Sequence, residues 1–267
     1  MKQTLKRILT PRMVETMGNA YDAVRRLPEV PAATLHPWRR ESIRKLAALK
    51  DSHRGERCFI MGNGPSLRST DLSKLQGEFT FGFNRIFLAA AELGFTPSCI
   101  VSINDLVIEQ SVAELQALKM PKFFAWRARK WLQMDADTHF IYTSYTGPGF
   151  SRDVTGRVWE GATVTNVALQ LAYHMGFSKV ILIGVDHNFA SQGTPNTTVV
   201  SEGADPNHFS GAYFGKGFRW QLPDLETSER GYANARRAFE SDGRQVVDAT
   251  IGGKLTIFPK VAYDSLF

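Results

Sequence analysis

The stretch FIMGNGPSL, residues 59–67, joins an apolar run to a Gly-Asn-Gly turn that Pro65 and Ser66 follow directly. The glycines permit a tight turn and close backbone approach, while Pro65 presets φ and Ser66 can cap a helix. Free amides at such a helix start favour phosphate. The stretch therefore predicts a buried strand that ends at a phosphate-binding turn, with a ligand-free structural turn as the alternative. It matches neither G-x-G-x-x-G nor the P-loop.

Short apolar runs of the same kind recur along the chain, with helix-like pieces between them. The runs cover residues 57–62, 79–84, 98–104, 122–126, 138–144 and 179–186, and the helical pieces cover 69–75, 86–93, 106–117 and 165–175. Runs apolar on both faces that alternate with helices are typical of a parallel sheet covered on both sides. The sequence predicts an α/β fold, Rossmann-like and doubly wound, with a mostly parallel sheet. A helix at 225–241 and the strand after it are expected to add the last edge.

The first 50 residues differ from the rest and are expected to form a basic helical N-terminal extension before a catalytic domain at 51–267. Residues 1–27 read as one helical stretch interrupted by Pro11. Three prolines within 27–37 predict a linker, and apolar spacing predicts a second helix at 39–49.

Composition and charge limit the classes of partner and the cellular compartment that we expect for this chain. The 267 residues carry a net charge of +6, and thirteen basic residues within 1–57 face few acidic ones. Zinc-finger spacing and interleaved aromatic and basic residues are missing, so nucleic acid is not expected as a partner. No membrane-spanning run or secretory signal is evident, which favours the cytoplasm. Cys58 and Cys99 lie within apolar runs and are expected to be buried free thiols.

Two further associations stay open at this stage. Leu5, Ile8, Leu9 and Met13 fall on roughly one helical face among basic residues, which would suit peripheral contact with the inner membrane. Packing of this segment on its own domain is the alternative. A homo-oligomer is equally compatible with the sequence.

Polar residues close several of the predicted strands. Ligands of doubly wound sheets bind at the carboxyl ends of the strands, near the point where strand order reverses. Asn84, Asn104, Asp105 and Asp186 each follow an apolar run there, and their side chains can bond a base edge, a ribose or a sugar. Simple turns are the alternative for each asparagine.

Residues 187–223 show no regular periodicity but contain several glycines and aromatic residues at 209, 213, 214, 218 and 220, which predicts a lid rather than a solvated coil. His208 and His187 are the imidazoles near the predicted cleft, and His208 is the candidate general base. Lys216 and Arg219 follow closely and could neutralise a leaving phosphate.

Four motifs, IMGNGPSL, FGFNR, TVTN and VILIGVD, occur in the order seen in bacterial lipooligosaccharide sialyltransferases that use CMP-sialic acid. The chain also resembles the MptE-like family (domain of unknown function 115), which includes archaeal 6-hydroxymethyl-dihydropterin pyrophosphokinases and bacterial proteins implicated in surface or flagellar glycosylation. The resemblance covers about residues 55–215 and implies the Rossmann-like fold and a nucleotide site.

The sialyltransferase resemblance also implies roles for individual residues. Asn63, Gly64 and Ser66 would contact the phosphate and sugar of the donor, Asn84 the nucleotide, and Thr163 and Val164 would line its pocket. Asn188 stands where that family has a tyrosine. In the loop NHFSGAYFGKG, His208 matches the first histidine of the family motif, and Ala212 replaces the catalytic second one.

The sequence favours a glycosyltransferase that uses a nucleotide-activated, CMP-linked sugar to build a surface glycan. The partners would then be a nucleotide-sugar donor and a glycan acceptor. One alternative is an MptE-like 6-hydroxymethylpterin pyrophosphokinase, which requires ATP and Mg²⁺. A second is an accessory protein that binds a nucleotide without turnover.

Catalytic roles are assigned to His208, Asp186 and His187. The residues assigned to nucleotide or phosphate contact are Gly62, Asn63, Gly64, Pro65, Ser66, Asn84, Asn104, Asp105, Thr163, Val164, Gly184, Asn188, Lys216 and Arg219. No protein-bound metal is expected from Asp186, Asp205, His187 and His208, whose spacing is not diagnostic. Mg²⁺ would enter only with a diphosphate donor, and Asp105 and Asp186 would then be its ligands.

Overall fold

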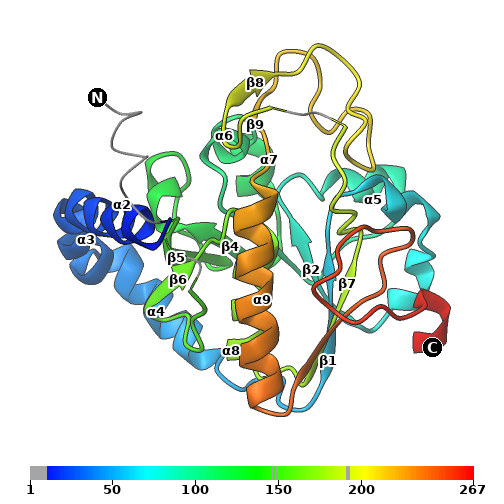
Figure 1. The fold of residues 1–267 in the computed structure, drawn as a ribbon, viewed down its shortest axis with the longest axis horizontal. Helices are drawn as coiled ribbons and strands as arrows, with labels where there is room; N and C mark the ends of the chain where they lie inside the picture. The colour runs from blue at the N-terminus through cyan, green and yellow to red at the C-terminus, as the bar shows by residue number, and fades with distance from the viewer. Residues whose placement is uncertain (1–10, 146, 148, 191–192) are drawn as a thin grey trace.

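The computed structural model describes residues 11–145, 147, 149–190 and 193–267. Within this part of the chain, eight strands form one parallel sheet and two more form a short antiparallel hairpin (Figure 1). The order across the large sheet is β10-β7-β1-β2-β3-β4-β5-β6. The predicted Rossmann-like α/β fold with a mostly parallel sheet is confirmed.

All six predicted apolar runs form strands of this sheet. They are β1 (Arg57–Met61), β2 (Phe79–Phe83), β3 (Cys99–Ser102), β4 (Lys122–Ala125), β5 (Thr138–Ser144) and β7 (Lys179–Ile183). The expected strand after the last long helix is β10 (Gln245–Asp248), which pairs with β7 at the edge. Strand β6 (Arg157–Trp159) was not predicted, because three residues are too few to show a period.

Helices cover both faces of the sheet. Cys58 and Ile60 of β1 face α8 (Val164–His174) and α9 (Leu225–Ser241), whereas Phe59 and Met61 face the opposite layer. That layer contains η2 (Pro65–Ser69), η3 (Leu72–Leu75), α5 (Leu88–Glu92), α6 (Asp105–Glu109), α7 (Val112–Ala117), η4 (Trp126–Lys130) and η5 (Tyr263–Leu266). Because both faces are covered, the strands are apolar on both sides, as the runs predicted.

The N-terminal segment is helical where a linker was expected. It contains α2 (Pro11–Arg26), η1 (Leu27–Glu29), α3 (Val30–Leu35) and α4 (Pro37–Ala48). The linker prediction for 27–37 was wrong, because its prolines occupy first-turn positions, where a missing N–H costs nothing. Leu5, Ile8 and Leu9 lie outside the described residues.

Helix α4 packs beside β5, at a stretch of that strand that β6 does not reach. The Phe140 amide of β5 donates to Ser42 Oγ of α4 at 2.9 Å, and Lys45 Nζ donates to the Thr138 carbonyl at 3.3 Å. A helix thus satisfies edge groups that a neighbouring strand would otherwise bond.

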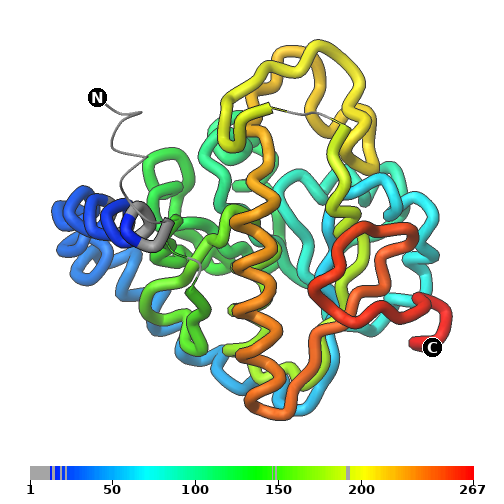
Figure 2. Tube along the Cα trace, viewed as in Figure 1, coloured from blue at the N-terminus to red at the C-terminus, as the bar shows by residue number. Residues whose placement is uncertain are grey.

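The segment after β7 contains two strands that its sequence did not reveal. Strands β8 (Thr198–Val200) and β9 (Arg219–Gln221) pair antiparallel within the predicted lid, whose yellow trace lies at the top of Figure 2. Cys58 and Cys99 are buried free thiols, as predicted. Among the helices of the described ranges, none is long and apolar enough to cross a membrane.

Candidate functional site

Strand order reverses between β1 and β7, because the chain runs outward from β1 to β6 and then returns to the other side of β1. The two strand ends approach so closely that a Cβ at Gly62 would lie 2.2 Å from the Gly184 carbonyl oxygen. A Cβ at Gly184, whose φ is +64°, would lie 2.6 Å from the Gly62 carbonyl oxygen. These glycines therefore permit backbone to pack on backbone at the point where doubly wound folds bind ligands.

The Asp186 carboxylate fills the turn after β1. Ser66 donates to it twice, from Oγ at 2.7 Å and from the backbone amide at 3.2 Å. The space beside Gly64 is also taken, since a Cβ there would lie 1.8 Å from Asp186 Oδ2. Burial raises the pKa of Asp186, against the lowering effect of the bonds from Ser66.

This arrangement changes the expected role of the Gly-Asn-Gly turn. The amides of Gly62 and Gly64 donate to the Ile183 and Gly184 carbonyls, and the Ser66 amide donates to Asp186. Pro65 has no N–H to offer. The phosphate expected at these amides would have to displace a protein acceptor, so in this structure the turn joins β1 to β7.

Two asparagines at the ends of β1 and β2 lie beneath the lid. The Asn63 carbonyl accepts from the Phe209 amide at 2.8 Å, while Asn63 Oδ1 is buried without a hydrogen-bond partner among the described residues. Asn84 has a φ of +50° and its Oδ1 accepts from Ser102 Oγ at 2.9 Å. Tyr213 of the lid is fully buried and accepts a hydrogen bond from the Arg85 amide at 3.3 Å. The lid is thus attached to both strand ends.

His208 is held in a defined orientation above these asparagines. Its Nδ1 lies 2.7 Å from Asp205 Oδ2, and its ring stacks on Tyr213 with centroids 4.0 Å apart. Asp205 is itself fixed, because its Oδ1 accepts from the Asn207 amide at 2.8 Å. An ionised carboxylate only accepts, so Nδ1 carries the proton and Nε2 of a neutral ring is the free base. A carboxylate-oriented imidazole is the arrangement of a general base.

Near the end of β7, Tyr232 of α9 links His187 to the start of α8. The Tyr232 hydroxyl lies 3.3 Å from Thr163 Oγ1, and Thr163 caps α8 by accepting from the Thr165 amide. The His187 ring packs edge-on to Tyr232 and its Nε2 lies 2.9 Å from Glu229 Oε1. Thr163 and the half-buried Val164 therefore lie at the same end of the molecule as His187.

Asn104 and Asp105, the residues expected after β3, both have structural partners. Asn104 caps α6 by accepting from the Leu106 and Val107 amides. Asp105 Oδ1 accepts from Arg127 Nε at 2.6 Å, and Arg127 also pairs with the buried Glu160. Although burial opposes it, Glu160 and Asp105 together raise the pKa of Arg127. A charge network therefore occupies the ends of β3 to β6.

Asp105 and Asp186 were expected to bind Mg²⁺ only if a diphosphate donor is used, and each has other partners in the structure. Asp105 is neutralised by Arg127 and Lys130, while Asp186 is engaged by Ser66 and burial disfavours its ionised form. No group of three histidine, cysteine or acidic side chains that could hold a metal occurs within the described ranges. These residues as placed do not fit a bound Mg²⁺ ion.

The remaining predicted contacts lie nearer the surface. Asn188 and Lys216 are exposed, and Arg219 on β9 pairs with Glu109 at 3.0 Å. Asp205, considered beside His208 from the sequence only as a possible metal ligand, lies three residues before it and orients its ring. The local signal was present, because Asp side chains commonly bond groups two or three residues later.

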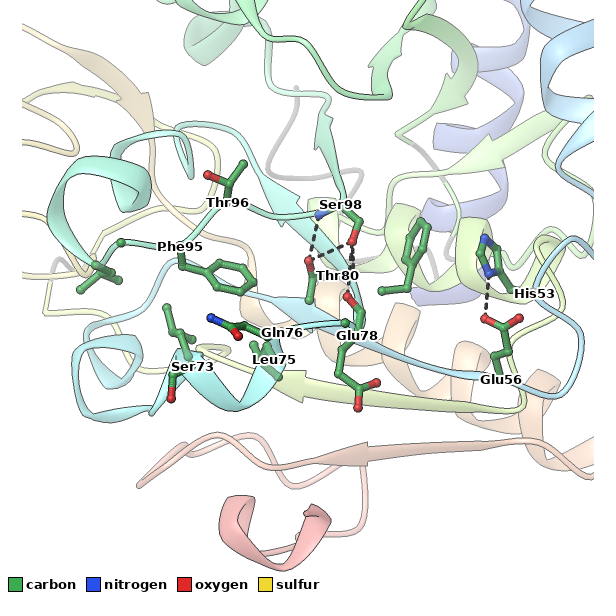
Figure 3. Close-up of a pocket in the computed structure, with 15 residues that line it drawn as sticks. His53, Glu56, Ser73, Leu75, Gln76, Glu78, Thr80, Phe95, Thr96 and Ser98 are labelled. Atoms are coloured by element: carbon green, nitrogen blue, oxygen red, sulfur yellow. Dashed lines mark hydrogen bonds and ion pairs between the residues drawn. The ribbon is translucent and has the colours of Figure 1, made fainter.

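A cavity of about 770 Å³ lies at the opposite edge of the sheet, beside the amino ends of β1, β2 and β3 (Figure 3). His53 pairs there with Glu56 at 2.9 Å, and Thr80 and Ser98 exchange bonds between their hydroxyls and amides. These four polar side chains are thus bonded in pairs, and the cavity is remote from the carboxyl ends of the strands. We therefore place the candidate site at the carboxyl ends of the strands. The reason is the chemistry of the residues that meet there, not the volume of a cavity.

The fold resembles that of the MAf glycosyltransferase from Magnetospirillum magneticum AMB-1, with a TM-score of 0.51 and 14% sequence identity. The match covers 97% of this chain but 43% of that one, so this chain spans less than half the length of that structure. No curated protein matches the chain significantly. Residues 36–192 match the family described as 6-hydroxymethylpterin diphosphokinase MptE-like. Because that match covers more than half of the sequence, the chain belongs to the MptE-like family.

Proposed function

We propose that this protein is a nucleotide-dependent glycosyltransferase, with a CMP-linked sugar as its favoured donor and a surface glycan as its product. The observation that carries the proposal is the Asp205–His208 pair, fixed over the ends of β1 and β2. Two comparisons support a group-transfer reaction. The description of the family names a diphosphokinase, and the similarly folded MAf protein is named a glycosyltransferase.

In the proposed reaction His208 is the general base. The acceptor hydroxyl attacks the anomeric carbon of the donor while its proton passes to His208 Nε2. The bond from the anomeric carbon to the phosphate oxygen breaks, and CMP leaves with the electron pair. Asp205 holds the imidazole in the required tautomer and stabilises the imidazolium that forms. Attack opposite the leaving group inverts the anomeric centre.

Lys216 is the better candidate of the two predicted cations for the leaving phosphate. Its ammonium has no ion pair within the described part of the chain, whereas Arg219 is engaged with Glu109. Lys216→Ala should therefore weaken donor turnover more than Arg219→Ala. Equal effects would remove the distinction.

The family description keeps a second candidate, a pterin diphosphokinase, in view. That reaction transfers a diphosphate from ATP and relies on Mg²⁺ to neutralise the phosphates. Asp105 and Asp186, the carboxylates assigned to the metal, are engaged by Arg127 and Ser66. Because both carboxylates are engaged by protein groups, the metal ligands that this chain offers favour the glycosyltransferase over the diphosphokinase.

The first test is a calorimetric binding screen of CMP, CDP, UDP, GDP, ADP and ATP, each with and without Mg²⁺. Selective binding of CMP without metal is the expected result. ATP or ADP binding that requires Mg²⁺ would replace the proposal with the diphosphokinase. Failure of all six nucleotides to bind would refute both reactions.

The second test is CMP release from CMP-linked sugars, with and without added acceptor. His208→Ala should reduce release by about 10²- to 10⁴-fold while CMP affinity changes little, because a general base acts on the reaction and not on nucleotide binding. Asp205→Asn should lower the rate through the same histidine. His53→Ala removes the matched histidine–carboxylate pair at the opposite edge and should leave release unchanged once the folded fraction is verified.

Parallel loss of CMP binding in His208→Ala would show that this histidine is a nucleotide contact and not the base. Tight CMP binding by the wild-type protein without release from any CMP-linked sugar would favour the accessory protein.

A further inference from the structure

Helix α2 carries apolar side chains on its outer surface. Met13, Met17, Tyr21 and Val24, which we call the α2 stripe, are 49%, 54%, 70% and 64% exposed. At 3.6 residues per turn these four positions fall within an arc of about 80°. Leu27, 61% exposed, follows directly after the helix. The stripe is therefore one continuous apolar surface and not a set of scattered side chains.

The helix is attached to the body from the other side. Arg26, about 140° around the helix from Tyr21, donates from Nη1 to the Thr143 carbonyl at 2.5 Å. Figure 1 shows α2 at the periphery of the molecule, on the side of β5 and β6. A surface helix ordinarily turns its apolar face to the core. Here that face points away from the core, as expected of an interaction surface.

The charge of the chain is concentrated in the same segment. Residues 1–57 hold thirteen of the 32 lysines and arginines but six of the 26 acidic residues, a net charge of +7. Residues 58–267 hold nineteen basic and twenty acidic residues, so the remainder is close to neutral. Arg25 and Arg40 are exposed within this basic segment.

We propose that the α2 stripe binds an anionic lipid surface. Met, Tyr and Val side chains enter the boundary between headgroups and acyl chains, while exposed basic residues of the same segment, such as Arg25 and Arg40, meet the negative headgroups. An apolar stripe alone would also fit a second copy of this chain. A symmetric pair would, however, bring two segments of +7 together, and the repulsion favours lipid over self-association.

The test is flotation of the full chain with vesicles of phosphatidylcholine alone and with about one third phosphatidylglycerol, at low and high salt. Tyr21→Glu and Ala23→Glu are the matched variants, since both positions are exposed and both gain one negative charge. Position 23 lies about 160° from position 21 around the helix, away from the stripe. Light scattering of each protein without lipid reports its oligomeric state.

We expect binding to the anionic vesicles only, weakened by salt. Tyr21→Glu should reduce the partition constant by about tenfold or more, because a large apolar side chain is replaced by a charge. Ala23→Glu should cause a much smaller loss. Equal losses, or no vesicle binding by the wild-type protein, would overturn the proposal. A wild-type dimer that Tyr21→Glu converts to a monomer, without lipid binding, would assign the stripe to a second copy.

Discussion

Replacing Gly64 by Ala tests the close packing of the turn after β1 against Asp186. The Gly64 backbone lies in the extended region, with φ −68° and ψ 161°, so alanine meets no dihedral strain there. Its Cβ would nevertheless lie 1.8 Å from Asp186 Oδ2 and 2.8 Å from the Gly184 carbonyl oxygen. The carboxylate must therefore move away.

The magnitude follows from the bonds that this movement breaks. Asp186 accepts from Ser66 Oγ at 2.7 Å and from the Ser66 amide at 3.2 Å, and a hydrogen bond to a charged group contributes about 1.5–3 kcal/mol. Because Asp186 is only partly buried, we expect Gly64→Ala to lower the free energy of unfolding by about 3–4 kcal/mol. In a chain of this size that corresponds to a melting temperature lower by about 6–12 °C.

The assay is urea unfolding followed by circular dichroism, with Gly203→Ala as control, because a Cβ at Gly203 has no neighbour within 4 Å. The control should stay within about 0.5 kcal/mol of the wild type. In an Asp186→Ala background, Gly64→Ala should cost only about 1 kcal/mol, because only the contact with Gly184 remains. The same cost in both backgrounds would refute the steric explanation.

Three further predictions concern charges and thiols. Lys122 is 1% exposed and donates to Asp135 Oδ2 at 2.6 Å, so Asp135→Asn should destabilise the fold by about 2–3 kcal/mol, less than for a fully buried pair because Asp135 is one-third exposed. Despite the opposing effect of burial, Lys122 and Thr138 lower the pKa of Asp135 to about 2. Urea unfolding should therefore show that the contribution of Asp135 to the free energy of unfolding is complete above pH 3.8 and is lost as pH falls toward 2. Burial raises the pKa of Asp186, so its neutral form stabilises the fold below pH 3.8 and that contribution is lost as pH rises through the raised value. The free energy of unfolding of Asp186→Asn, measured relative to wild type, should therefore rise from pH 4 to pH 7. A difference between the two proteins that does not change with pH would contradict this. Burial also raises the pKa of Cys58 and Cys99, so Ellman's reagent should modify both thiols only at the rate of unfolding, and rapid modification of the native chain would contradict their burial.

Local pattern was sufficient for the secondary structure of the sheet. Six apolar runs and the helix at 225–241 form elements at the expected places, because a strand buried on both faces must be apolar at nearly every position. The proline-rich segment at 27–37 was misread, since proline is compatible with both a linker and the first turn of a helix. The pairing of β8 with β9 depends on contacts between segments about 20 residues apart, which no local period records.

For the candidate site, local sequence was enough to show which polar residues end each strand and that His208 lies in a segment rich in aromatic residues. Which of these residues meet depends on the tertiary fold. Because β7 returns to the side of β1, Asp186 accepts a hydrogen bond from Ser66, 120 positions away in the sequence. The turn amides are therefore bonded to protein acceptors. The attachment of Phe209 to Asn63 carries the Asp205–His208 pair over the strand ends. Contacts of this kind depend on the crossover of the chain and on side-chain packing, and neither leaves a short-range pattern in the sequence.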